Sequence, residues 1–297
     1  MPTTLRPRRS ALYVPGDNQR ALEKARGLAA DVLIFDLEDS VAPANKDVAR
    51  RQVAAAIASG AYGRRERVVR VNALDTPWGK DDLLAATSAG ADAVLLPKVE
   101  SAAQLREAER SLIATGTPAP PALWCMIETP RGVLHAEEIA DASPRLTCLV
   151  LGTTDLAKDL HAASVPGRAP LLPALGHCIL AARAAGLGCL DGVHLDLEDE
   201  DGFEDACRQG AAMGFDGKTL IHPKTIEAAN RAFGPSAQAL EEARRVIAAY
   251  AAASAEGKGV AVVDGKLVEQ LHVSAAQRLI NLAEQIALMV EEAGLAP

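Results

Sequence analysis

The stretch DVLIFDLEDSVAPANKDVARRQVAAAIA, residues 31–58, contains the pattern that decides the fold. It opens with a short apolar run, Val32–Asp36, that includes branched residues and ends on a carboxylate. A longer segment of helical period, Asn45–Ala58, follows it. One such unit predicts a buried strand and a helix that covers one face of a sheet.

The same alternation recurs over roughly 230 residues and yields eight strand candidates, as in a (β/α)8 barrel. They are Ala11–Pro15, Val32–Asp36, Val68–Asn72, Ala93–Lys98, Leu123–Glu128, Thr147–Gly152, Leu190–His194 and Lys218–Ile221. Strands that are apolar on both faces are typical of a parallel sheet covered by helices. We therefore predict an α/β protein, with a TIM barrel as the catalytic domain over residues 1–233.

Residues 234–297 predict a C-terminal extension that acts as a lid or in oligomerisation. Two helices, Ser236–Ala253 and Ser274–Ala293, flank an extended segment whose Asp264–Gly265 pair is a hairpin signal. Apolar residues recur every three or four positions in the final helix, at Leu279, Leu282, Ile286 and Val290. Such a face must be covered, either by the chain itself or by another subunit.

Composition and charge narrow the class of protein. The chain has 297 residues, of which 49% are apolar and 24% charged, as in ordinary globular proteins. A net charge of −8 argues against nucleic acid or an anionic membrane as a partner. No apolar run approaches the roughly 18 residues of a membrane helix. Five cysteines without C-x-x-C spacing predict buried thiols in a reducing, cytoplasmic compartment.

Several predicted strands end on a polar residue. These residues are Asp36, Asn72, Lys98, Glu128 and His194, with Asp155 just beyond Gly152. The carboxyl ends of barrel strands form one rim, where catalytic groups gather. The pattern therefore predicts that residues far apart in the chain share one site.

Two of these carboxylates, Glu128 and Asp155, suggest a metal site. Two carboxylates, water and substrate oxygens make a typical Mg2+ environment. The alternative is that both residues cap helices or accept buried hydrogen bonds.

Arg70 lies between β-branched neighbours near a strand end. An unpaired buried guanidinium is costly, so we expect an acidic partner or an anionic ligand. Asp36, Glu38 and Asp39 are the candidate partners. This acidic cluster either orients Arg70 and a metal-bound water or forms a polar layer of the barrel.

Other motifs are weaker or missing. His222, directly before a proline, predicts a capping residue rather than a general base. Arg20 and Lys46 belong to a group of cations near the amino terminus that is either solvated surface or a local site for an anion. The sequence has no serine-hydrolase elbow, P-loop or dinucleotide fingerprint.

Taken in order, the motifs resemble those of the HpcH/HpaI aldolase and citrate lyase β-subunit superfamily, in its CitE-like CoA-ester lyase branch. The resemblance runs through Arg9–Asp17, Phe35–Val41, Arg70–Asp75, Leu96–Lys98, Ile127–Pro130, Gly152–Leu156 and Gly214–Lys218. It covers nearly the whole chain, and it is more specific for the family than for the substrate.

The resemblance implies a reversible Claisen-type lyase that splits a 3-hydroxyacyl-CoA into a 2-oxo acid and a short acyl-CoA. Malyl-, methylmalyl- and citramalyl-CoA are the candidate substrates. Alternatives are a citryl-CoA lyase with citrate lyase partner subunits, a variant that also hydrolyses the thioester, and a non-catalytic relative that binds metal or CoA. It also implies a homotrimer or hexamer.

The resemblance further assigns roles to residues. Glu128 and Asp155 would ligate Mg2+, or Mn2+ in its place, and Arg70 would stabilise the thioester enolate. The backbone from Gly152 through Thr153 and Thr154 would hold the oxo-acid carboxylate. Candidate contacts to CoA are Tyr13, Pro15, Arg20 and Lys46.

The family's lid carries an acidic residue in a Gly-Lys-Met-Val-Asp pattern, whereas residues 265–269 here read GKLVE. The resemblance implies that Glu269 is the general acid or base. Asp36, Glu38 and a metal-bound water are the alternatives. The longer side chain changes the reach of the acid, to which proton transfer is sensitive.

Overall fold

The computed structural model describes residues 6–293, which fall into two compact units. The larger unit is Arg8–Phe233, and the described residues of the smaller one are 6–7 and 234–293.

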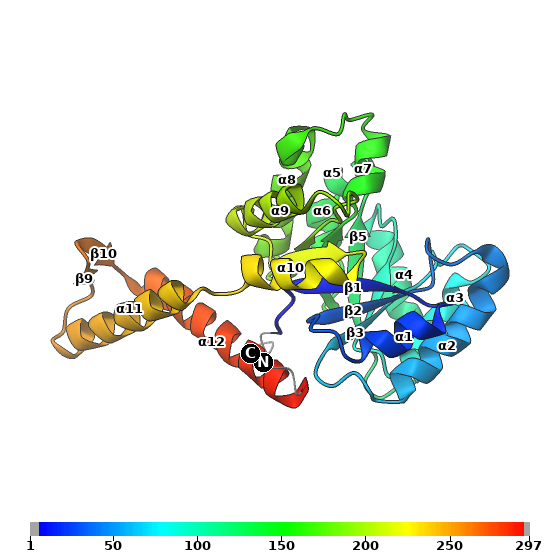
Figure 1. Cartoon of the computed structure of the whole chain (residues 1–297), viewed down its shortest axis with the longest axis horizontal. Coiled ribbons are helices and arrows are strands. Elements are labelled where there is room, and N and C mark those ends of the chain that lie inside the picture. Colours follow the sequence, from blue (N-terminus) through cyan, green and yellow to red (C-terminus); the bar gives the residue numbers. More distant parts are fainter. Residues whose placement is uncertain (1–5, 294–297) are drawn as a thin grey trace. The chain divides into compact units, whose positions relative to one another are not determined.

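The larger unit is a closed barrel of eight parallel strands in sequential order, which confirms the predicted fold (Figure 1). The strands are β1 (Ser10–Pro15), β2 (Val32–Asp36), β3 (Glu66–Arg70), β4 (Ala93–Leu96), β5 (Ala122–Ile127), β6 (Leu146–Leu151), β7 (Gly188–Asp191) and β8 (Gly217–Leu220). β1 closes the barrel by pairing with β8, Ala11 opposite Thr219.

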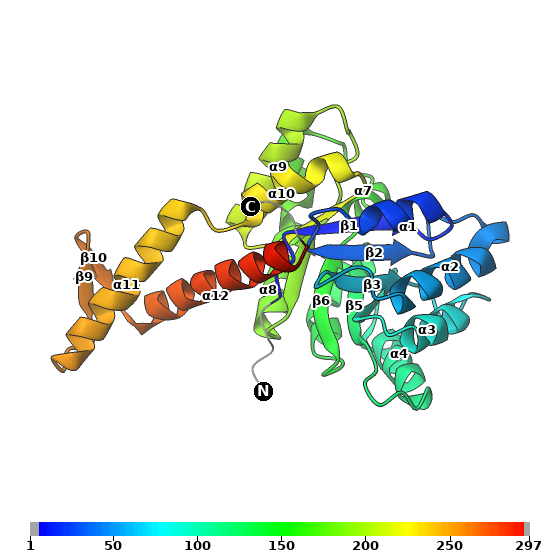
Figure 2. The same cartoon turned by 60° about the horizontal axis from the view of Figure 1, so that its bottom comes forward.

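Helices surround the strands on the outside of the barrel (Figure 2). They are α1 (Gln19–Ala25), α2 (Lys46–Ala58), α3 (Gly79–Ser88), α4 (Ala102–Ala114), α5 (Pro130–Leu134), α6 (Ala136–Ala140), α7 (Thr153–Asp159), α8 (Leu172–Ala184), α9 (Glu200–Met213) and α10 (Ile226–Phe233). Short 3-10 turns, η1 (Pro43–Asn45), η2 (Pro166–Leu171) and η3 (Pro223–Thr225), precede α2, α8 and α10. Each turn starts with a proline, whose fixed φ suits the first position of a helix.

Several strands are shorter than predicted at their carboxyl ends. Lys98, Glu128, Gly152 and His194 lie just beyond β4, β5, β6 and β7. Lys98 has a φ of 47°, which no strand residue adopts. Lys98, Glu128 and His194 therefore belong to the loops that leave the strands and not to the strands themselves.

The barrel interior is filled by side chains rather than open. One apolar cluster inside it includes Ile34, Val68, Leu95 and Trp124, all buried. Such filling is the rule for barrels of eight strands.

The amino-terminal end of the barrel is closed by an ion pair. Arg8 Nε lies 2.7 Å from Glu66 Oε2, and the Arg8 guanidinium lies 4.6 Å from the centre of the Trp124 ring.

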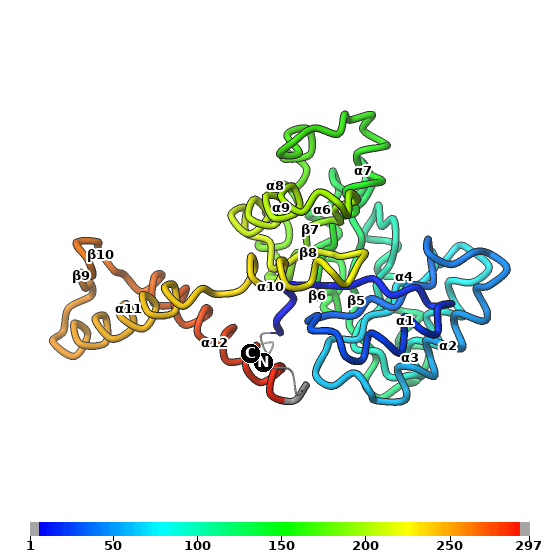
Figure 3. Tube along the Cα trace, viewed as in Figure 1, coloured from blue at the N-terminus to red at the C-terminus, as the bar shows by residue number. Residues whose placement is uncertain are grey.

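The smaller unit is a helical hairpin with a β-ribbon between its helices, which Figure 3 traces in orange and red. α11 (Ala237–Ala255) is followed by antiparallel β9 (Ala261–Val263) and β10 (Lys266–Val268), then by α12 (Gln270–Ala293). Asp264 and Gly265 both have positive φ, as a two-residue type I′ turn requires. The predicted hairpin is confirmed.

The five cysteines are free and buried, as predicted. Within residues 6–293, none of the helices has the length and apolar character needed to cross a membrane.

Candidate active site

Asp36 and Arg70 form the centre of the site, at the carboxyl ends of β2 and β3. Strand register places them side by side, on the inward face that also carries Ile34 and Val68. Arg70 Nε donates to Asp36 Oδ1 and Nη2 donates to Oδ2, both at 2.7 Å. The predicted acidic partner of Arg70 is therefore Asp36, in a bidentate pair of the strong, oriented type.

Both carboxylate oxygens of Asp36 accept hydrogen bonds from Arg70 and from the loop that follows β2. Its two oxygens also accept the N–H groups of Glu38 and Ser40. Burial opposes its charge, but the hydrogen bonds and charge of Arg70 outweigh this and keep the pKa of Asp36 below its ordinary value. This geometry suits an orienting role for Asp36 better than the acid–base role considered from the sequence.

The remaining edge of Arg70 faces a second acidic group. Arg70 Nη1 lies 3.2 Å from Glu38 Oε2 and 3.6 Å from Asp39 Oδ2. Burial, assisted by the charge of Asp39 and opposed by Arg70, raises the pKa of Glu38. Glu38 is therefore better able than Asp36 to carry a proton.

Glu128 lies across the barrel mouth and is only 2% exposed. Its Oε1 accepts the backbone N–H of Lys98 at 2.8 Å. Its Oε2 packs against Gly152, where an added Cβ would stand 2.4 Å from that oxygen. Burial raises the pKa of Glu128 to about 7, against the opposing influence of Lys98. Within the described residues no side-chain cation forms an ion pair with Glu128, so this buried carboxylate is suited to a metal ion.

Asp155, in the first turn of α7, adds a second carboxylate. Its charge contributes to the raised pKa of Glu128, so the two groups are electrostatically coupled. Within residues 6–293, no set of three or more His, Cys, Asp and Glu side chains is grouped to hold a metal. A metal at Glu128 and Asp155 would thus rely on water and substrate oxygens for its other ligands, as Mg2+ commonly does.

The turn from Gly152 to Asp155 carries the backbone donors that begin α7. Gly152 is the N-cap of α7 and offers no side-chain cap to the first-turn N–H groups of Thr153 and Thr154. Such groups bind carboxylates readily.

A buried charge network supports this turn from behind. Asp191 pairs with Arg168 and with Lys218, each at 2.8 Å, and its Oδ1 accepts the N–H of Gly192. Gly192 lies so close to Thr153 that a Cβ added to Gly192 would be 2.3 Å from the Thr153 hydroxyl.

The residues expected to contact CoA have varied environments. The Tyr13 ring lies beneath the Arg70 guanidinium at 4.7 Å. The Lys46 ammonium donates to the carbonyls of Leu37 and Glu38, at 2.8 and 2.7 Å, and so secures the loop after β2. Pro15 ends β1, and Arg20 is exposed on α1.

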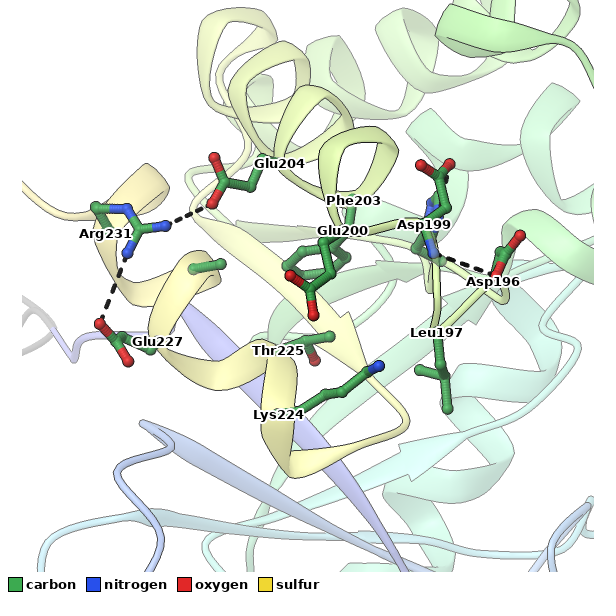
Figure 4. A pocket seen from close by; sticks show the side chains of 12 residues that line it. Asp196, Leu197, Asp199, Glu200, Phe203, Glu204, Lys224, Thr225, Glu227 and Arg231 are labelled. Carbon is green, nitrogen blue, oxygen red and sulfur yellow. Dashed lines mark hydrogen bonds and ion pairs between the residues drawn. The ribbon is translucent and has the colours of Figure 1, made fainter.

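Two histidines singled out from the sequence lie elsewhere. His222 Nδ1 accepts the N–H of Lys224, which confirms the predicted cap. His194 lines a hollow formed by the loop after β7, α9, η3 and α10. Figure 4 shows that Arg231 in this hollow pairs with Glu204 and Glu227, so its charge is balanced locally. Neither Arg70 nor Glu128 lines this hollow.

Glu269 lies in the smaller unit, between β10 and α12, and is exposed. Its N–H donates to His272 Nδ1 at 3.0 Å. Its carboxylate remains a candidate for the lid acid.

Comparison with known proteins decides the family. Residues 9–223 match the model of the HpcH/HpaI aldolase/citrate lyase family. The chain belongs to this family. The predicted membership in this family of enzymes is thereby confirmed.

Three relatives show how far the similarity extends. A (3S)-malyl-CoA thioesterase of Cereibacter sphaeroides strain KD131 is 53% identical over 281 residues, 95% of this chain and 96% of the relative. The citrate lyase subunit beta of Escherichia coli K12 is 39% identical, over 94% of both chains. The structure of protein CitE from Mycobacterium tuberculosis with magnesium, acetoacetate and coenzyme A matches with a TM-score of 0.73 and 34% identity, covering 93% of this chain and 97% of that one.

Replacing Glu128 with Gln should weaken Mg2+ binding by roughly tenfold or more, because the amide removes one of two charged ligands. Isothermal titration calorimetry with MgCl2 would measure the dissociation constant. The fold should persist, since the Gln oxygen can still accept the Lys98 N–H. Glu107→Gln, on the exposed face of α4, is the matched control. Unchanged Mg2+ affinity in Glu128→Gln would exclude this residue as a ligand.

Proposed function

We propose that the protein is a Mg2+-dependent enzyme that acts on a short 3-hydroxyacyl-CoA thioester of the malyl-CoA class. The observation that carries the proposal is the pairing of an oriented Arg70 with the buried, uncompensated carboxylate of Glu128 at one barrel mouth. Relatives named for malyl-CoA and citrate lyase, and the CitE structure with magnesium and coenzyme A, support it.

Thioester hydrolysis is the favoured reaction, and carbon–carbon cleavage is the second candidate. The malyl-CoA thioesterase is 53% identical to this chain, whereas an L-malyl-CoA/beta-methylmalyl-CoA lyase of Cereibacter sphaeroides is 36% identical. The leading expectation from the sequence was the lyase. The greater similarity to the thioesterase favours hydrolysis over carbon–carbon cleavage. The citrate lyase relative is the reason to retain cleavage as the second candidate.

Arg70 suits both reactions, because in each the thioester oxygen gains negative charge in the transition state. Its guanidinium is fixed by Asp36 before substrate arrives, so no reorganisation is needed at the moment of reaction. The backbone N–H groups of Thr153 and Thr154 would hold the substrate carboxylate. Mg2+, when bound by Glu128 and Asp155, supplies Lewis acidity and a template for substrate oxygens.

Hydrolysis adds the hydroxyl of water to the acyl carbon, breaks the C–S bond and leaves the proton on the CoA thiol. We infer that Glu38 takes the proton of that water; its raised pKa and its position beside Arg70 support this role. Glu269 is the alternative proton carrier if the smaller unit covers the site.

An assay of the purified chain with Mg2+ against malyl-, methylmalyl-, citramalyl- and citryl-CoA would test the function. Free thiol without oxo acid indicates hydrolysis. Oxo acid without thiol indicates cleavage, and both together indicate cleavage followed by hydrolysis. Turnover by the chain alone would also show that no citrate lyase partner subunit is required. Absence of turnover with the whole panel would contradict the proposal and favour a non-catalytic binding role.

Arg70→Lys should reduce kcat by roughly a hundredfold or more, the scale set by removal of one oriented oxyanion contact. Lysine keeps the charge but loses the planar fork that pairs with Asp36. The Mg2+ dissociation constant should change little, because Arg70 is not a ligand. Near-parental turnover would instead make Arg70 a structural ion-pair residue.

We further propose that the smaller unit of one subunit covers the barrel of another in a homotrimer or hexamer. Its ribbon and the start of α12 expose large apolar side chains, since Val262, Leu267 and Leu271 are each more than half exposed. Such faces are commonly buried between subunits.

Under this arrangement Glu269→Gln should fold and bind Mg2+ normally but turn over slowly, because an amide exchanges no proton at neutral pH. Glu269→Asp should retain more activity than Glu269→Gln. Mixing Glu269→Gln with Arg70→Lys chains under subunit exchange should restore part of the activity, as some sites would then combine a parental barrel with a parental lid. Parental turnover by Glu269→Gln would transfer the proton role to Glu38. Proven exchange without recovery would favour a lid from the same chain.

A further inference from the structure

Lys98 stands out because its backbone is strained at the site. It follows β4 and Pro97, and it is one of four non-glycine residues with positive φ in the described part of the chain. A non-glycine residue adopts a positive φ at an energetic cost, so the surrounding structure must hold it there. Such residues cluster at functional sites.

The strained backbone is what directs the Lys98 N–H to Glu128. That bond is 2.8 Å long, and the next N–H, of Val99, donates to the Met126 carbonyl of β5 at 3.2 Å. Gly132 packs so closely against Val99 that a Cβ added to Gly132 would lie 2.5 Å from the Val99 carbonyl oxygen. These hydrogen bonds attach the segment after β4 to β5. They also fix the orientation of the Glu128 carboxylate.

The Lys98 ammonium contacts a different group. Its Nζ lies 3.4 Å from Glu38 Oε1, while the other oxygen of Glu38 lies 3.2 Å from Arg70 Nη1. The Lys98 side chain is 45% exposed, compared with 9% for Arg70, so Lys98 stands at the outer edge of the mouth. Glu38 is thus shared between an inner and an outer cation.

The contact between Lys98 and Glu38 changes the balance of charge around Arg70. One guanidinium faces three carboxylates, Asp36, Glu38 and Asp39. Such an excess of negative charge would oppose further negative charge on a substrate oxygen. A second cation that holds Glu38 reduces the excess and leaves the Nη1 edge of Arg70 more available.

We propose that Lys98 is a positioning residue of this site, which orients Glu128 through its backbone N–H and draws Glu38 away from Arg70 through its ammonium. The second part rests on the proposed function of Arg70. The first part concerns only the metal ligand and needs no substrate.

Two substitutions in the full-length protein separate the two parts. Lys98→Asn removes the ammonium but keeps a residue that tolerates positive φ, whereas Lys98→Val removes both. Lys98→Arg is the conservative control. If Lys98→Val does not fold, Lys98→Thr replaces it, because Thr is also β-branched and disfavours positive φ.

Calorimetry with MgCl2 measures the Mg2+ dissociation constant and so tests whether the Lys98 N–H orients Glu128. Lys98→Asn should bind Mg2+ within about threefold of the parental protein, and Lys98→Val should bind roughly tenfold more weakly, as expected for loss of a group that orients a ligand. Parental Mg2+ affinity in the valine or threonine variant would overturn this part.

Kinetics with malyl-CoA read the ammonium part. Lys98→Asn should lower kcat roughly tenfold or more at nearly unchanged KM, because the loss falls on charge that develops in the transition state. Lys98→Arg should recover most of this. Adding Lys98→Asn to Glu38→Gln should lower kcat little below that of Glu38→Gln alone, since Glu38 is the group through which the ammonium acts. Parental kcat in Lys98→Asn, or losses that simply multiply in the double variant, would overturn an action through Glu38.

The two arms also distinguish this inference from the proposed function. If the parental protein turned over none of the CoA esters, the proposed function would fail, and with it the ammonium part. The Mg2+ titrations would still decide whether Lys98 orients Glu128.

Discussion

The site depends on one buried ion pair, between Arg70 and Asp36. A guanidinium at the mouth of a filled barrel is stable only with a partner of good geometry, and loss of one member of such a pair leaves the other charge uncompensated. Strand register supplies that geometry, because Asp36 and Arg70 are directly opposed on β2 and β3. The loop after β2 is then built around the same carboxylate through the N–H groups of Glu38 and Ser40. Removing Asp36 would therefore release the loop as well as the guanidinium.

The lower part of the barrel increases the effect of these charges. Beneath Arg70 lie Tyr13 and Met126, and the far end is closed by the Arg8–Glu66 pair. Water is excluded from below, so charges at the mouth interact more strongly than they would at an open surface. The same environment explains why burial raises the pKa of Glu128 and prepares it for a cation.

The sequence predicted the barrel and the centre of the site because both follow from strand periodicity. Strands apolar on both faces indicate a parallel sheet, and polar residues at their carboxyl ends predicted Asp36 and Glu128 at one rim. Arg70 was expected near the end of its strand with an acidic partner. The role proposed for Lys98 did not follow, although it ends the same pattern. Its positive φ is held by hydrogen bonds to β5, which depend on tertiary contacts. Nor can a sequence show that the Lys46 ammonium turns back onto the carbonyls of Leu37 and Glu38.

The barrel residues do not by themselves choose between hydrolysis and carbon–carbon cleavage. Under the proposed function Arg70 would face the same thioester oxygen in both, and Glu128 and Asp155 would hold the same end of the substrate. What differs is water, which must reach the acyl carbon for hydrolysis and must be kept from an enolate during cleavage. Control over water belongs to whatever covers the mouth. The choice of reaction is therefore expected to depend on the segment around Glu269, where this chain carries Glu instead of the family's Asp, more than on the strands that build the site.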